Sequence, residues 1–215
     1  MAQPPRLVHS TVAFIVAAFM THKPSILLAS NSPRRRELLT QIGIPFEHFA
    51  PDIDETPLAG ELPDAYVCRM AEQKARTGWQ MRPASSTARW LLAADTSVVI
   101  GNDILGKPQD AADAAAMLRR YSDSVHQVMT AIAVTDGERF AVNNVITQVY
   151  FRALTETEIS AYVDTGEPMD KAGAYGIQGT AALFVSHLEG SYTGVMGLPL
   201  FETGQLLQAF GYPIL

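Results

Sequence analysis

The sequence predicts an α/β fold in which helices surround a long, twisted, mixed β-sheet. In the first half of the chain, short apolar runs at residues 26–29 and 90–94 are bounded by turn residues and separated by helical patterns. In the second half, two long strand patterns flank residues 135–138, where Asp136 and Gly137 form a dipeptide typical of hairpins. A hairpin at this place argues against a purely parallel sheet.

The length of 215 residues indicates one domain, or two closely fused lobes. Hydrophobic residues make up 47% and charged residues 18%, a balance that gives no sign of disorder. The formal net charge is −6, so the chain lacks the overall basic character of proteins that bind nucleic acid through its backbone. Local basic clusters therefore indicate a small anionic ligand, and we expect neither a nucleic-acid nor a membrane partner.

An apolar run at residues 12–20 follows Arg6 and His9. It is shorter than the roughly 20 apolar residues that cross a bilayer. It has the character of a signal-peptide core, but no clear small-x-small cleavage site precedes Lys23. We therefore interpret residues 1–19 as an N-terminal extension upstream of Met20, and residues 20–215 as a single domain. A signal peptide is the alternative.

The single cysteine, Cys68, has no second thiol with which to form an intrachain disulfide. This is compatible with a reducing cytoplasm, where we expect the protein to reside. Because Cys68 lies inside a helical pattern, we expect a buried bystander, with a catalytic thiol as the alternative.

The first half of the chain predicts strands at residues 26–29, 46–50 and 90–94 and helices at 33–42, 63–77 and 110–121. Ser32 is a favourable N-cap, and Pro33 suits the first helical position because its missing N–H has no partner there. Gly43 and Gly78 are placed to end the first two helices. The third strand is predicted to end at Asp95.

The second half predicts strands at residues 127–134, 140–152 and 182–186 and helices after residue 155 and at 199–210. Thr155 and Glu158 have the spacing of a capping box, which opens the first of these helices. Gly166 is placed to close it.

Residues 30–35 lead from a strand into a helix whose first turn carries Arg34 and Arg35. Free amide groups and the helix dipole already favour an anion at that end, so cations are normally unfavourable there. The two arginines therefore indicate an anionic partner such as a phosphate chain, which arginine binds bidentately. A solvated basic helix face is the alternative.

Carboxylates gather at residues 52–55, which include Asp52, Asp54 and Glu55. Hard oxygen ligands of this kind suit Mg²⁺ or Mn²⁺, although a wet acidic turn is the alternative. Asp95 follows an apolar strand, where ligands bind in α/β sheets. We interpret Asp95 as a metal ligand or general base, against the alternative of a turn or N-cap aspartate.

Residues 101–107 imitate a P-loop, with glycines at 101 and 106 followed by Lys107. Pro108 stands where a P-loop has the Ser or Thr that holds Mg²⁺, so we reject that assignment. Lys107 remains a candidate phosphate ligand.

A glycine-rich segment at residues 170–179 permits close backbone approach, but its spacing is not that of a dinucleotide fingerprint. Lys171 supplies a point charge. Gln178 offers both a donor and an acceptor, which suits the edge of a base. A tight structural loop is the alternative.

Together these segments resemble the Maf family of nucleoside triphosphate pyrophosphatases, which is related to the inosine-triphosphate pyrophosphatases. The matching stretches, in family order, are residues 28–35, 52–55, 94–96, 106–108, 170–179 and 197–200. Each stretch alone is weak evidence for the family. Because all of them occur in the same order as in the family, a chance match is a poor explanation. The resemblance implies two lobes around a nucleotide cleft, and it leaves residues 1–19 without a counterpart.

The resemblance also implies a reaction and roles. Asp95 would be the catalytic base, and Arg34, Thr96 and Gln178 match the branch of the family that acts on dTTP and UTP. At Thr130 and Ala131 the family often has Thr-Gly, a departure that puts little in doubt.

We therefore expect hydrolysis of a nucleoside triphosphate to a monophosphate and pyrophosphate, supported by Mg²⁺ or Mn²⁺ held by Glu55 and Asp95. The expected phosphate ligands are Ser30, Ser32, Arg34, Arg35, Lys107 and Lys171. Thr96 and Gln178 would read the pyrimidine, together with Arg34. The alternatives are a purine or 7-methyl-GTP preference in the same fold and a nucleotide-binding regulator of cell division without turnover. A homodimer is compatible with the sequence, which does not fix the oligomeric state.

Overall fold

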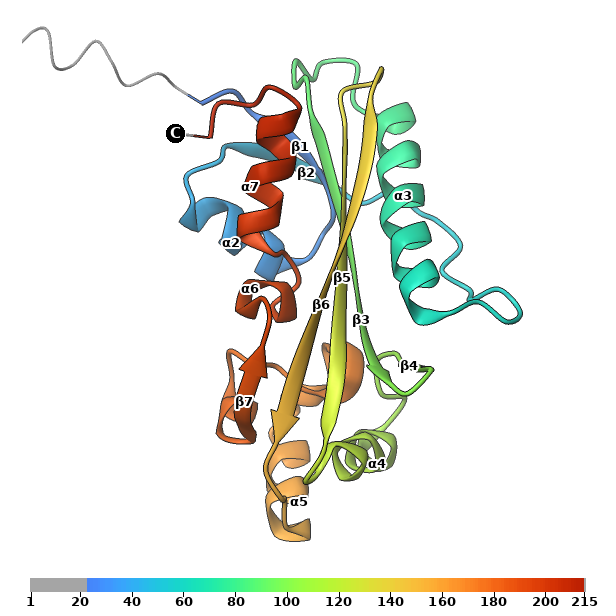
Figure 1. Cartoon of the computed structure of the whole chain (residues 1–215), viewed down its shortest axis with the longest axis vertical. Coiled ribbons are helices and arrows are strands. Elements are labelled where there is room, and N and C mark those ends of the chain that lie inside the picture. The colour runs from blue at the N-terminus through green and yellow to red at the C-terminus, as the bar shows by residue number, and fades with distance from the viewer. Residues whose placement is uncertain (1–22, 215) are drawn as a thin grey trace, which may run out of the picture.

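A computed structural model describes residues 23–214, which form a seven-stranded mixed sheet with helices on both faces (Figure 1). The predicted fold class is confirmed. The strand order is β2-β1-β3-β5-β6-β7, and β4 pairs with β3 away from this path. The predicted N-terminal extension, residues 1–19, lies outside the described residues.

The strands are β1 (Ile26–Ala29), β2 (Phe46–Phe49), β3 (Leu91–Ile100), β4 (Asp103–Leu105), β5 (Val125–Thr135), β6 (Phe140–Phe151) and β7 (Val185–Glu189). The helices are α2 (Pro33–Gln41), α3 (Pro63–Met81), α4 (Ala111–Tyr121), α5 (Glu156–Asp164), α6 (Tyr192–Val195) and α7 (Leu200–Ala209). Short 3₁₀ turns cover Glu167–Asp170, Ala172–Ala174 and Thr180–Leu183. Within residues 23–214, no helix has the length and hydropathy needed to cross a membrane.

The three long strands β3, β5 and β6 run through both lobes of the molecule (Figure 1). In the upper lobe, α3 covers one face of the sheet, and α2 and α7 lie on the other. The lower lobe carries α4, α5 and β7. Only β1 pairs in parallel, with β2 and β3, and the remaining pairs are antiparallel.

The helix α3 runs to Met81, past the end predicted at Gly78. Gly78 is buried, and a Cβ at this position would lie 3.0 Å from the Cβ of Ala29 and 3.2 Å from Cδ1 of Leu91. This glycine therefore allows the helix to approach the sheet closely and does not end it. The predicted helix end at Gly78 is wrong, because glycine is needed at this position for packing against the sheet and not for ending the helix.

The strand β3 does not end at Asp95, as predicted, but continues to Ile100. It continues because β5 pairs with it along almost its whole length, including Asp95 opposite Ala131. On the other side, β1 is in register only with Leu91 and Leu92, while β4 begins its pairing at Val98. Between these two partners, the edge of β3 around Asp95 is left unpaired, and a cleft opens there.

The predicted strand at residues 182–186 is displaced to β7, because Thr180–Leu183 form a 3₁₀ turn. Ser32 lies at the N-cap of α2, as predicted, but its side chain makes no capping hydrogen bond. Two signals at α5 are confirmed. The capping box of Thr155 and Glu158 is present in both directions, and Gly166 follows the helix with a positive φ of 73°.

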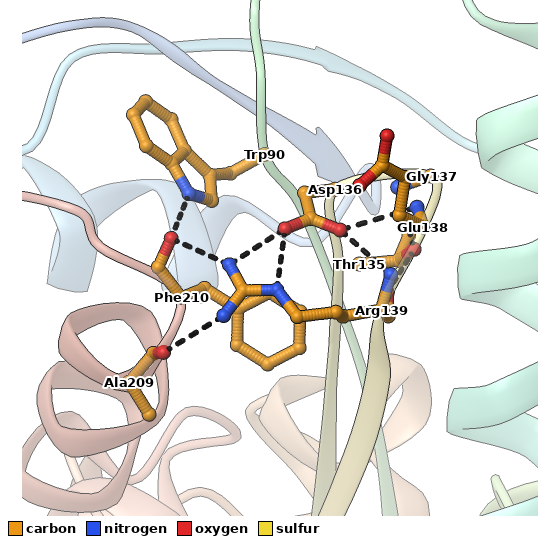
Figure 2. Close-up of polar contacts among 8 residues, drawn as sticks. All are labelled: Trp90, Thr135, Asp136, Gly137, Glu138, Arg139, Ala209 and Phe210. Carbon is orange, nitrogen blue, oxygen red and sulfur yellow. Dashed lines mark hydrogen bonds and ion pairs between the residues drawn. The ribbon is translucent and has the colours of Figure 1, made fainter.

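Figure 2 shows how Arg139 fastens the tip of the β5–β6 hairpin to the end of α7. Its guanidinium donates to Oδ2 of Asp136 at 2.7 and 2.9 Å and to the carbonyl oxygens of Ala209 and Phe210 at 3.2 and 3.0 Å. The indole of Trp90 donates to the same Phe210 carbonyl at 2.9 Å. Carbonyls at a helix end have no partner within the helix, so these bonds cap α7 and hold the hairpin to it.

An aromatic cluster in the lower lobe surrounds His126, which is 2% exposed. The ring centroids of Tyr121, Phe151 and Tyr175 lie 4.3, 5.2 and 5.3 Å from that of His126. Nε2 of His126 shares a hydrogen bond of 2.7 Å with the Tyr175 hydroxyl, and Nδ1 has no partner among the described residues. Burial lowers the pKa of His126 from 6.5 to about 3, so the ring is neutral in the native protein.

We expect the stability of the protein to fall as pH decreases from about 6.5 towards 3. In that range the unfolded chain takes up a proton at His126 that the native protein cannot accept, because the native pKa is about 3. This one group should contribute a slope of up to about 1.4 kcal/mol per pH unit to the free energy of unfolding. Urea unfolding at a series of pH values, for the wild type and His126→Gln, measures the difference. Equal slopes for the two proteins would show the prediction to be wrong.

Candidate active site

A cleft of about 1130 Å³ opens where the edge of β3 is unpaired, between the two lobes. The ten residues predicted from sequence to form the site all line it: Ser30, Ser32, Arg34, Arg35, Glu55, Asp95, Thr96, Lys107, Lys171 and Gln178. They come from segments up to 148 residues apart in the chain, so the fold brings together what the motifs only suggested.

At the start of α2, Arg35 is held in place by three oxygen atoms. Its Nε donates to the Gly197 carbonyl at 2.8 Å, Nη1 donates to Ser30 Oγ at 3.0 Å, and Nη2 donates to Thr96 Oγ1 at 3.1 Å. Burial lowers the pKa of Arg35, and the nearby charge of Asp95 opposes this shift. A guanidinium has five N–H groups, so two remain for a ligand in the cleft.

The hydroxyl of Thr96 belongs to an ordered chain of hydrogen bonds. Thr130 is fully buried and donates its one hydroxyl hydrogen to the Gly194 carbonyl at 2.8 Å. The 3.0 Å contact between the two threonine hydroxyls must therefore be donated by Thr96. Because Thr96 also accepts from Arg35, its oxygen can offer a ligand one lone pair but no hydrogen.

On the opposite face of β3, Asp95 and Glu55 share a single cation. The ammonium group of Lys74 lies 2.7 Å from Oδ1 of Asp95 and 2.7 Å from Oε1 of Glu55. The side chains of Lys74 and Asp95 are 15% and 12% exposed, whereas Glu55 is 58% exposed. Low exposure strengthens the pairing of Lys74 with Asp95, and the second oxygen of Asp95 makes no hydrogen bond within residues 23–214.

Sequence reasoning missed Lys74, although a signal was present. On α3, Lys74 follows Val67 by seven residues and Met70 by four, so it falls on the same face as these buried residues. A charged residue on the apolar face of an amphipathic helix needs a buried partner. Here the partner is Asp95.

Tyr66, eight residues before Lys74 on α3, also lines the cleft and was not predicted. Its hydroxyl donates to the backbone oxygen of Glu55 at 2.9 Å. Burial, and then the charges of Asp95 and Glu55, raise the pKa of Tyr66 to about 12. The phenol therefore stays protonated and acts as a donor.

The donor set around Asp95 fits a divalent cation that shares its coordination with a ligand. Asp95 and Glu55 supply hard oxygen atoms that already converge on one cationic group. Within residues 23–214, no group of three or more His, Cys, Asp or Glu side chains could hold a metal alone. Mg²⁺ is commonly bound by one or two carboxylates together with substrate phosphates, and Asp95 and Glu55 provide two at this place in the cleft.

The cleft carries positive charge that its own carboxylates do not neutralise. Lys171 donates to Oδ1 of Asp170 at 2.7 Å and to the Glu167 carbonyl at 2.6 Å. By contrast, Arg34 and Lys107 make no ion pair with any residue in the described part of the chain. The arrangement suits a ligand with several negative charges.

The sequence profile of the family described as Maf-like protein matches residues 25–210. The chain belongs to the Maf family. The resemblance inferred from the motifs is thereby confirmed.

Within the Maf family, the chain is similar to proteins named dTTP/UTP pyrophosphatase. It is 52% identical to the one from Aromatoleum aromaticum over 203 residues, which cover 88% of this chain and 97% of the relative. It is 51% identical to the one from Chromobacterium violaceum over 195 residues, with 90% and 98% covered. The solved Staphylococcus aureus Ham1 protein aligns over 86% of this chain and 97% of its own at 12% identity, with a TM-score of 0.40 that is too low to support an argument.

Proposed function

We propose that this Maf protein hydrolyses dTTP and UTP to the monophosphate and pyrophosphate. The observation that carries the proposal is the cleft itself, which sets the partly buried Asp95 beside Lys74 and near the cation-bearing start of α2. The names of relatives about 50% identical to the chain support the choice of substrate. The lone free cysteine is compatible with action in the cytoplasm.

Release of pyrophosphate requires water to attack the α-phosphorus while negative charge gathers on the leaving group. Positioning and electrostatic stabilisation supply most of such a catalysis. In our proposal Asp95 orients the water and accepts its proton, using the oxygen that Lys74 does not bind. Arg34, Lys107 and the two remaining N–H groups of Arg35 bind the phosphates. Lys171, Ser30 and Ser32 complete the proposed phosphate site, in which Ser30 Oγ also accepts from the Ser32 N–H and from Arg35.

A divalent cation, Mg²⁺ or Mn²⁺, would be held by Asp95 and Glu55. When bound, such an ion neutralises phosphate charge and lowers the pKa of a water molecule. Lys74 would help to hold the two carboxylates near each other, since its ammonium group contacts both.

The experiment is an incubation of the purified protein with dTTP or UTP and Mg²⁺ or Mn²⁺, with products separated by ion-exchange chromatography. We expect the nucleoside monophosphate and pyrophosphate in equal amounts. Orthophosphate and a nucleoside diphosphate would place the attack at the γ-phosphorus and contradict the proposal. Products formed from 7-methyl-GTP or a purine nucleotide, but from neither pyrimidine, would reassign the substrate. Absence of turnover with any nucleotide would favour a binding regulator.

A further inference from the structure

Glu167 lines the cleft but has no role in the reaction described above. It lies at the start of a 3₁₀ turn (Glu167–Asp170), just before the glycine-rich segment that carries Gln178. Its carboxylate makes no ion pair with any residue in 23–214. A carboxylate without a cation in a cleft that suits polyanions needs an explanation, since it repels phosphate.

The carboxylate of Glu167 accepts a hydrogen bond directly from one end of the stretch 176–180 and is linked to the other end through the Tyr162 hydroxyl. Its Oε2 accepts from the backbone N–H of Thr180 at 3.1 Å. Its Oε1 accepts from the Tyr162 hydroxyl at 3.0 Å, and that hydroxyl in turn accepts from the N–H of Gly176 at 3.2 Å. Gln178 lies at the middle of the stretch and is exposed to the cleft.

The backbone around Gln178 is shaped to fit this carboxylate. A Cβ added at Gly179 would collide with the Glu167 carboxylate, at 2.7 Å from Oε2. The 3₁₀ bond from the Gly179 N–H to the Gly176 carbonyl, 3.0 Å long, closes the turn between the two anchored ends. Glycine at 179 therefore permits the close approach that both hydrogen bonds require.

We propose that Glu167 is a positioning residue for base selection, which holds the stretch 176–180 so that Gln178 meets the edge of the nucleobase. This inference rests on the proposed function. A carboxylate is required because both of its oxygens must accept, whereas an amide in its place can accept at one oxygen only. Tyr162 contributes to the same positioning, because its hydroxyl links Glu167 to the N–H of Gly176.

The test is Glu167→Gln, which keeps the shape of the side chain and turns one acceptor into a donor. We expect the KM for UTP to rise and the preference for UTP over CTP to fall by about fivefold, the effect of one lost hydrogen bond. The kcat for UTP should change less than KM. Tyr162→Phe removes only the link to Gly176 and should shift the same ratio in the same direction. Glu156→Gln is the matched control, since Glu156 is exposed, pairs with Arg119 and lies outside the cleft.

A readout that does not need turnover separates this inference from the proposed function. Amide hydrogen exchange in peptides covering residues 176–180 should be faster in Glu167→Gln without nucleotide, by about the same factor, and unchanged in Glu156→Gln. Exchange at the wild-type rate in the Glu167 variant would overturn the inference, whatever the protein hydrolyses. So would a lower kcat with an unchanged ratio of UTP to CTP. Failure of the wild type to release pyrophosphate would overturn the proposed function instead.

Discussion

Replacing Asp95 with asparagine should lower kcat for UTP by about 10²–10⁴-fold, the usual contribution of a general base. Asparagine keeps the shape of the side chain but cannot accept a proton from water. It also removes one of the two charges that face the Lys74 ammonium, which is 2.7 Å from Asp95. Weaker binding of a divalent cation would add to the loss. Initial rates of pyrophosphate release at several Mg²⁺ concentrations separate the two effects.

The control for this substitution is Asp103→Asn on β4, which removes an exposed carboxylate paired with Arg120 and leaves the cleft intact. It should keep wild-type turnover. Thermal unfolding of both variants is needed, because Lys74 is 15% exposed and loses a partner when Asp95 is replaced. A folded Asp95 variant that turns over at a near-normal rate would remove Asp95 from its assigned role.

The elements that sequence predicted well are those set by local chemistry. The capping box at Thr155 needs only the residue three positions later, and proline at position 33 needs only its own ring geometry. The hairpin at Gly137 follows from a positive φ of 93° that glycine adopts readily. Such signals lie within a few residues, so a single sequence contains them in full.

The elements that sequence predicted badly depend on distant partners. The charge of Asp95 predicts the end of an apolar strand, yet pairing with β5 carries the strand five residues further. Gly78 predicts a helix end, although its small size allows close contact with Ala29, 49 residues earlier. In both cases tertiary contacts overrode a correct local preference.

The site shows the same division. Motifs indicated ten residues that line one cleft, because each segment carries an unusual local concentration of charge or glycine. They did not indicate the direction of the Thr96 hydroxyl, which depends on Arg35, Thr130 and the Gly194 carbonyl together. Hydrogen-bond direction is a property of the assembled chain of partners and leaves no pattern in any one segment.

The direction of the Thr96 hydroxyl limits which hydrogen-bonding groups of a base it could contact. Thr96 offers a lone pair only, and Gln178 offers both a donor and an acceptor. Uracil and thymine share one edge with O2, N3–H and O4, and they differ only at the 5-methyl group. Cytosine lacks the N3 hydrogen and presents an amino donor in place of O4. If Thr96 faces N3 of the base, as our proposal requires, its lone pair would accept from the N3–H of uracil or thymine, whereas cytosine would present a second lone pair at that position.

We expect the wild type to prefer UTP over CTP in kcat/KM by roughly ten- to a hundredfold, because an unpaired buried polar group costs about 1–3 kcal/mol. Gln178→Ala should lose most of that preference while keeping similar acceptance of UTP and dTTP. Gln80→Ala, an exposed position at the end of α3 outside the cleft, is the control.

A wild type without preference would show that neither Thr96 nor Gln178 reads the base. A Gln178 variant with the full preference would assign the selection to Thr96, Arg34 or the backbone. Thr96→Val, which removes the fixed acceptor, would then show whether Thr96 carries it.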